Sequence, residues 1–254
     1  MVKGLELFAK YFASYSNQYV LIGGTACSLV MEEAGLDFRA TKDLDIVLYI
    51  EALDAQFVNA FWQFIKNGGY QNRQRSTDKE LFYRFSLPSD PEFPVMLELF
   101  SRVPDIVKIH GESHLTPIPV NEAIASLSAI LLNDEYYRFL HSKKRKINGL
   151  SVVDASHLIP LKARAWLDLV SRESNGADID KKDIRKHKND IFRLFQLLAP
   201  ADRIATTYSI KHDMHQFLEH IKSDQETDLK HLGLKNTNLK EIVDNLRLVY
   251  GIDH

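Results

Sequence analysis

The chain has 254 residues, of which 45% are hydrophobic and 26% charged, and its formal net charge at pH 7 is −2. This composition is typical of a soluble globular protein of one large domain or two modest ones. The near-neutral charge argues against a protein that coats nucleic acid non-specifically. The single cysteine, Cys27, excludes an internal disulfide and a cysteine-based zinc cluster, and it favours a reducing compartment. No apolar run approaches the roughly 20 residues of a membrane span, so we expect a cytoplasmic protein without membrane contact.

The first predicted element is an amphipathic helix over residues 2–16. Its apolar side chains recur at helical spacing and should pack inward: Leu5, Phe8, Phe12 and Tyr15. Charged residues lie between them, so the segment does not have the pattern of a signal peptide.

A strand, a glycine turn and a helix are predicted next. The apolar run YVLI at 19–22 is bounded by Gly23 and Gly24, which is typical of a buried strand followed by a turn. Thr25 then occupies the position of a helix N-cap, before the apolar stripe of ACSLVM. Cys27 falls within this helix, where a free cysteine usually acts as a small buried hydrophobe.

A second strand opens with two carboxylates, Asp43 and Asp45, which flank Leu44. Side chains two apart in a strand point to the same face, so both carboxylates project together. Two like charges at that spacing repel, and a fold tolerates them mainly when a cation lies between them. The sequence therefore predicts a binding site here and not a part of the core.

A helix over 53–70 follows, which ends at two glycines, and then a hairpin of two extended runs, ELFYRFSL and PVMLELFS. Glu98 interrupts the second run, and a glutamate in a central strand is costly unless a charged group meets it. The alternative is an edge strand with Glu98 in water.

Beyond residue 103 the chain is strand-like as far as 120, and a long helical region is predicted from 121 to a basic cluster, KKRK, at 143–146. The cluster fits either a solvated helix end or a contact with the backbone of an RNA. The following INGLSVVD predicts a turn and a short strand, with Asp154 capping the next helix.

Four further helices are expected, around 155–173, 186–200, 210–222 and 239–251. In the first, Lys162 shares the buried face of Leu158 and Trp166, so it should either reach out to solvent or meet an anion. In the second, Asp190 lies beside the buried edge and fits a pairing with Lys162, contact with a nucleotide, or an exposed acid paired along its own helix. The histidines at 187, 212, 215 and 220 show no metal-ligand spacing and are expected at the surface.

Several of these motifs together resemble the DNA polymerase β-like nucleotidyltransferases. GGT at 23–25, followed by TKDLD at 41–45 with Arg39 just before it, is most similar to the AbiEii type, which includes type IV toxins. LKARAWLDL at 161–169 matches the motif in which a lysine contacts the triphosphate, and HKNDIFRL resembles the last motif of that type.

The resemblance implies an α+β fold: a nucleotidyltransferase core at 1–120, with a mixed sheet flanked by helices, and a mainly helical region at 121–254 that completes the cleft. It also implies a two-metal site for Mg²⁺ or Mn²⁺ and a contact set for an NTP. The metal ligands would be Asp43, Asp45 and Glu98. The nucleotide contacts would be Gly23, Gly24, Thr25, Lys42 and Lys162, and the catalytic set would add Lys162 and Asp190 to the three carboxylates.

The implied reaction moves an NMP from an NTP to a hydroxyl acceptor such as tRNA or another RNA, and an antitoxin protein is an expected partner. KKRK and KKDIRKHK favour an RNA acceptor. Two alternatives stay open. One is a small-molecule transferase of the aminoglycoside type, and the other is a non-catalytic nucleotide-binding member of the fold.

Overall fold

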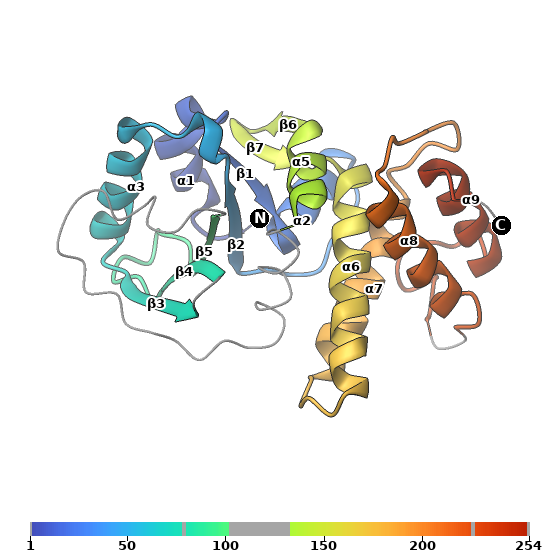
Figure 1. Ribbon diagram of the computed structural model, residues 1–254. Helices are drawn as coiled ribbons and strands as arrows, with labels where there is room; N and C mark the ends of the chain where they lie inside the picture. The colour runs from blue at the N-terminus through green and yellow to red at the C-terminus, as the bar shows by residue number, and fades with distance from the viewer. Residues whose placement is uncertain (1, 78–79, 102–132, 225–226, 253–254) are drawn as a thin grey trace. The chain divides into compact units, whose positions relative to one another are not determined.

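The structure is a computed structural model that describes residues 2–77, 80–101, 133–224 and 227–252. The chain divides into two compact units, one formed by Met1–Asn121 with His141–Asp154 and the other by Glu122–Leu140 with Ala155–His254. The first unit contains a mixed sheet flanked by helices, and the second is helical (Figure 1). The fold class is therefore α+β, as expected.

Within the described residues, the first unit holds a sheet of seven strands in the order β3-β4-β5-β2-β1-β7-β6. The pairs β2–β5 and β1–β7 are parallel, and the other neighbours are antiparallel. The strands are β1 (Tyr19–Ile22), β2 (Asp43–Leu48), β3 (Gln71–Thr77), β4 (Glu80–Ser86), β5 (Met96–Ser101), β6 (Lys144–Ile147) and β7 (Leu150–Val153). The expected β4–β5 hairpin is confirmed, whereas β3, a polar strand at the sheet edge, was not predicted.

The helices of this unit are α1 (Leu5–Phe12), α2 (Gly23–Glu33) and α3 (Ala55–Gly68), with short 3₁₀ turns η1 (Ala13–Tyr15) and η2 (Ile50–Ala52). The carboxylate of Asp54 caps α3 by accepting a hydrogen bond from the backbone N–H of Phe57. Gly69 ends the helix in the left-handed conformation, so the predicted glycine stop is confirmed.

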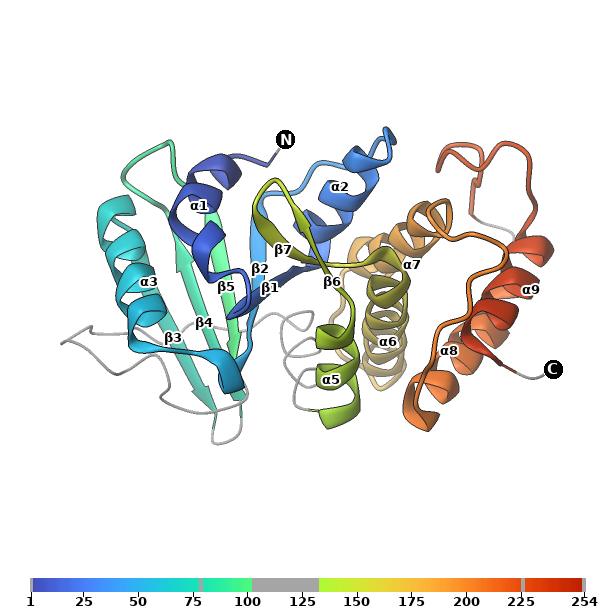
Figure 2. The ribbon, with the colours of Figure 1, turned by 90° about the horizontal axis from the view of Figure 1, so that it is seen from above.

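The core of the first unit is an aromatic cluster between the sheet and the pair α1 and α3, which lie on one side of it (Figure 2). Phe8 stacks on Phe12 with centroids 4.4 Å apart, and Phe12 meets Phe64 edge to face at 5.4 Å. Tyr19 of β1 joins them from the sheet. The inward face predicted for the first helix is confirmed, except that Tyr15 is only half-buried.

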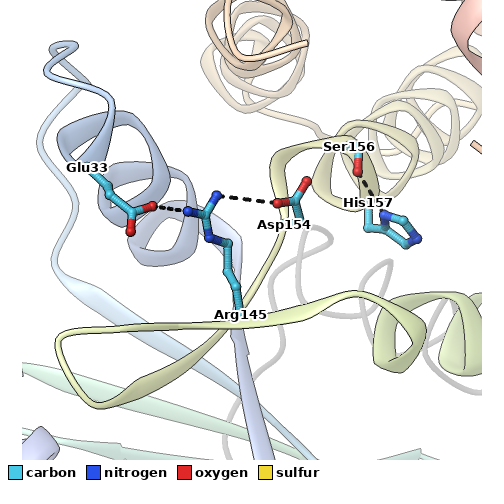
Figure 3. Close-up of polar contacts among 5 residues, drawn as sticks. All are labelled: Glu33, Arg145, Asp154, Ser156 and His157. Atoms are coloured by element: carbon cyan, nitrogen blue, oxygen red, sulfur yellow. Dashed lines mark hydrogen bonds and ion pairs between the residues drawn. The ribbon is translucent and has the colours of Figure 1, made fainter. Parts of the chain in front are cut away.

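The second unit contains α6 (Ala155–Ser174), α7 (Lys181–Phe195), α8 (Tyr208–Ile221) and α9 (Leu239–Tyr250), together with most of α5 (Asp134–Ser142). A buried polar network links three of these helices: Tyr136 donates to Asp213 at 2.7 Å, and Arg164 donates to the same carboxylate at 2.8 Å. His157 stacks on the ring of Phe139. Its Nδ1 lies 3.0 Å from the hydroxyl of Ser156 (Figure 3). No helix in the described ranges has both the length and the apolar character of a membrane span.

The basic cluster at 143–146 is not a helix end. The helix α5 stops at Ser142, and KRKI forms β6, the edge strand beside β7. Arg145 forms ion pairs with Glu33 and with Asp154, the latter at 3.4 Å (Figure 3). Lys144 lies over the ring of Tyr49, 4.9 Å from its centroid. Half of the cluster is thus engaged within the unit.

Two other expectations fall partly or wholly beyond what the structure describes. The strand-like run at 103–120 lies outside the described residues. Of the helical region predicted from 121, the structure describes only the last part, which contains α5. The turn and short strand expected from INGLSVVD are confirmed by the β6–β7 hairpin.

Candidate active site

The three predicted carboxylates occupy neighbouring strands of the first unit. Asp43 and Asp45 open β2, and Glu98 lies on the adjacent parallel strand β5 directly opposite Asp45. Because β5 lies between β4 and β2, it is a central strand, and Glu98 is only 6% exposed. The alternative of an edge strand with this glutamate in water is therefore wrong.

The face that carries the carboxylates can be deduced from β4. Phe85 packs edge to face against Phe61 of α3, 5.5 Å between centroids, so it points into the aromatic core. Arg84 precedes Phe85 and must point to the opposite face, and it pairs in register with Glu98. The face opposite the aromatic core thus carries Arg84, Glu98 and Asp45 in a row across three strands.

Arg84 makes a direct ion pair with Glu98. Its Nε and Nη2 both donate to Oε1 of the carboxylate, at 2.9 and 2.6 Å. This arginine was not predicted as a site residue, because the predicted hairpin does not define the register of its two strands. A register in which ELFYRFS pairs with MLELFS residue by residue places Arg84 opposite Glu98.

The carboxylate of Glu98 is electrostatically strained. Burial raises its pKa well above the usual range, and the charge of Asp45 and a hydrogen bond with that side chain raise it further. Arg84 lowers the pKa, and Asp43 adds a smaller upward contribution. Burial and the two aspartates thus outweigh the arginine, and their net effect favours the protonated form of Glu98.

The glycine turn is built around Asp45. Gly23 has φ +66°, and a Cβ on it would lie 1.6 Å from Oδ2 of this aspartate. Gly24 packs in the same way against Thr41, whose Oγ1 would lie 2.6 Å from an added Cβ. The absence of side chains at both glycines lets the carboxylate and Thr41 approach the first turn of α2.

Thr25 is not the N-cap of the helix, because α2 begins at Gly23 directly after β1. Thr25 lies inside the first turn and is completely buried. Its hydroxyl donates to the backbone carbonyl of Asp43 at 2.6 Å, which ties the first turn of α2 to the start of β2. Lys42, which immediately precedes Asp43, is exposed.

Lys162 and Asp190 form a buried ion pair within the second unit. The ammonium of Lys162 on α6 lies 3.1 Å from Oδ2 of Asp190 on α7, and the two side chains are 7% and 0% exposed. Arg193 lies 3.9 Å from the other oxygen of the same carboxylate. Of the options predicted for Lys162, the structure shows contact with an anion, and for Asp190 it shows pairing with Lys162.

The three carboxylates are suitable ligands for a divalent metal, since Mg²⁺ and Mn²⁺ prefer carboxylate oxygens. They also fit in electrostatics, because a cation would offset both the burial and the repulsion from Asp45 that raise the pKa of Glu98. As the side chains stand, however, no three His, Cys, Asp or Glu residues in the described part of the chain gather closely enough to hold a metal ion. One oxygen of Glu98 is held by Arg84 instead.

The comparisons with known proteins are sparse. No protein-family model matches the chain, and no curated protein matches it. Among solved structures, it is similar to an antigenic nucleotidyltransferase-like protein from Paracoccidioides brasiliensis. That likeness has 16% sequence identity, covers 89% of each chain and reaches a TM-score of 0.43. A similarity at this level does not decide function.

Proposed function

We propose that the protein is a metal-dependent nucleotidyltransferase of the AbiEii kind, which moves an NMP from an NTP to a hydroxyl of an RNA acceptor. The observation that carries the proposal is the placement of Asp45. Its carboxylate lies beside Glu98 on the neighbouring strand and against the backbone of Gly23 at the start of a helix. The backbone N–H groups at the start of a helix suit a phosphate group, and adjoining carboxylates suit its counter-cations.

The residues of the site would have distinct roles. The backbone N–H groups of Gly23 and Gly24 would bind the triphosphate. Asp43, Asp45 and Glu98 would hold Mg²⁺ or Mn²⁺, which supplies charge stabilisation for the attacking and leaving oxygens when bound. Glu98 would also accept the proton of the acceptor hydroxyl. The roles expected of Thr25, Lys42, Lys162 and Asp190 toward the NTP, and an antitoxin as partner, stay part of this proposal.

The direct test is transfer of label. The protein is incubated with each α-labelled NTP, Mg²⁺ and total cellular RNA, and the labelled product is identified. We expect Asp43→Asn to reduce labelling to background, because it removes one of the charges that hold the cation. The matched control is Asp37→Asn, which makes the same change at an exposed position outside the strand and should label normally. Undiminished labelling by Asp43→Asn would overturn the proposal.

One observation favours a second candidate, a nucleotide-binding protein without catalysis. Arg84 already neutralises part of the charge of Glu98. A site that had lost its metal would need such a cationic side chain to offset its buried carboxylates. Under this candidate the protein binds NTP with or without Mg²⁺ and labels no acceptor. Calorimetric NTP binding with Mg²⁺ or with EDTA separates the two, because the transferase needs the metal for tight binding.

A further inference from the structure

The second unit contains a pocket that none of the proposed catalytic residues line. Its walls come from α6, from α7, which packs beside it (Figure 1), and from residues 227–232. The volume is about 500 Å³, which falls within the range typical of small-molecule and nucleotide sites. We call this space the α6–α7 pocket.

Three cations on α7 line the pocket: Lys181, Arg185 and Lys188. Their spacing of four and then three residues puts them on one stripe of the helix. Lys188 is bonded to Asp224. Lys181 and Arg185 are exposed, and neither has an ion pair among the residues that the structure describes. Two uncommitted cations therefore stand at the same wall.

A buried aromatic side chain of α6 also lines the pocket. Trp166 of α6 lines the pocket, is 8% exposed, and packs edge to face against Phe217 at 5.3 Å. Its indole Nε1 has no hydrogen-bond partner within the described ranges. An aromatic side chain in the wall of a pocket suits the flat ring of a base.

The pocket also has acceptors and an apolar surface. Glu173 and Asp228 line it, and Asp228 accepts a hydrogen bond from the backbone N–H of His231 at 3.1 Å. Ile184 and Leu232 add apolar side chains. Two acids beside the cations disfavour a bare polyanion, whereas hydroxyl or amino groups would suit them. A ribonucleotide combines a phosphate, hydroxyl groups and a flat base. It therefore matches the cations, the acids, and the aromatic and apolar side chains that line the pocket.

We propose that the α6–α7 pocket binds one ribonucleotide of a single-stranded RNA acceptor. The phosphate meets Lys181 and Arg185, the base lies against the side of the pocket that contains Trp166, and Glu173 and Asp228 accept from hydroxyl or amino groups. This inference rests on the proposed function for the nature of its acceptor, but binding at this pocket is measured without NTP and without transfer.

Fluorescence of Trp166 reports the pocket directly. The chain has two tryptophans, so Trp62→Phe leaves Trp166 as the single emitter. Titration of this variant with a short single-stranded RNA should give a saturable change in emission, whereas inorganic phosphate should give none at the same concentration. An unchanged emission with RNA, or an equal response to polyglutamate, overturns the proposal.

Charge variants on α7 test the wall of cations. In the Trp62→Phe background, Lys181→Ala with Arg185→Ala should weaken RNA binding about tenfold and reduce the salt slope of log K by about 0.7, the value for one phosphate contact. The matched control is Lys182→Ala with Lys186→Ala, which removes the same charge from the same helix outside the pocket lining. Equal weakening by both pairs would indicate a diffuse attraction and overturn the site.

A last variant separates this inference from the enzyme proposal. Asp43→Asn, placed in the same single-tryptophan background, should bind RNA with the affinity of its parent, whatever its transfer activity. Loss of RNA binding in that variant would place the RNA site at the carboxylates and overturn the pocket. Absence of transfer by the unmutated protein, with the Trp166 response intact, refutes the enzyme and leaves the pocket standing.

Discussion

At the scale of single residues, the carboxylate of Asp45 occupies the space that a side chain at position 23 would fill. We expect Gly23→Ala to destabilise the protein and to abolish nucleotide binding, because the new methyl group must displace this carboxylate. Thermal unfolding and calorimetric NTP binding would show both effects.

Gly35 provides the matched control, since its φ of +72° is also left-handed and an added Cβ there meets nothing within 4 Å. Gly35→Ala should cost only the backbone strain, about 1–2 kcal/mol, and leave binding unchanged. Equal losses of stability in both variants, with NTP binding retained in both, would show that position 23 requires glycine only for its φ angle.

A second prediction at this scale concerns Glu98 and pH. Its pKa is raised in the folded protein, so the folded state holds a proton that the unfolded chain has already released. The stability linked to that proton is fully present below the pKa of the unfolded chain and is lost as pH rises through the folded pKa.

Glu98→Gln cannot ionise, so in EDTA its melting temperature should exceed that of the parent increasingly as pH rises. Glu92→Gln, at an exposed loop position, should show no such trend. A constant difference across pH for Glu98→Gln would contradict the prediction, and the transfer assay of the same variant should show lost activity.

How far the site could be predicted depends on the residue. The spacing of Asp43 and Asp45 sufficed to place both at the start of one strand, because alternation in a strand is local. The role of Thr25 could not be predicted, because its acceptor is a backbone carbonyl 18 residues away. The partner of Glu98 depends on strand register, which a turn-rich loop such as PSDPEFP does not define.

At the scale of elements, the buried pair of Lys162 and Asp190 joins α6 to α7. Removing one member leaves a buried charge without this partner, so we expect Asp190→Asn to cost about 3 kcal/mol in the free energy of unfolding. Lys162→Met should cost less, since Arg193 stays near the carboxylate. Urea unfolding followed by Trp166 emission measures both.

The double variant Lys162→Met with Asp190→Leu should recover most of that stability, because two apolar side chains replace a desolvated pair. Its NTP affinity then separates structure from function: an affinity equal to that of the parent would remove both residues from nucleotide binding. Simple addition of the two single-variant costs would contradict the expected coupling.

The β6–β7 hairpin shows why the basic cluster at 143–146 was wrongly predicted to end a helix. The sequence Asn148–Gly149 is the strongest short signal for a two-residue hairpin turn, and both residues have positive φ, with Ile147 paired to Leu150. The four basic residues before it were instead attributed to a helix end, where cations are also favoured. The turn residues were the more specific evidence, and charges are equally usual on an edge strand.

At the scale of the whole molecule, the sheet of the first unit includes strands from two distant parts of the chain. The predicted core, residues 1–120, lacks β6 and β7, so β1 would become an edge strand although all four of its residues are buried. We expect that fragment to aggregate, because an apolar edge is open to other chains. Gel filtration and circular dichroism of this fragment would test the expectation, and a monomer with cooperative unfolding would contradict it. The longer fragment 1–154 restores both strands and should recover a folded sheet.

The parallel pairing of Leu21 with Val152 also has a consequence for protein synthesis. At about 5–20 residues per second, the ribosome adds the roughly 130 residues between them in about 7–26 s. During that interval the nascent β1 has no neighbour on its β7 side, and its apolar residues are open to chaperones. The first unit therefore cannot complete its sheet co-translationally until β6 and β7 have left the exit tunnel, which ties the folding of the N-terminal strands to the elongation of the later ones.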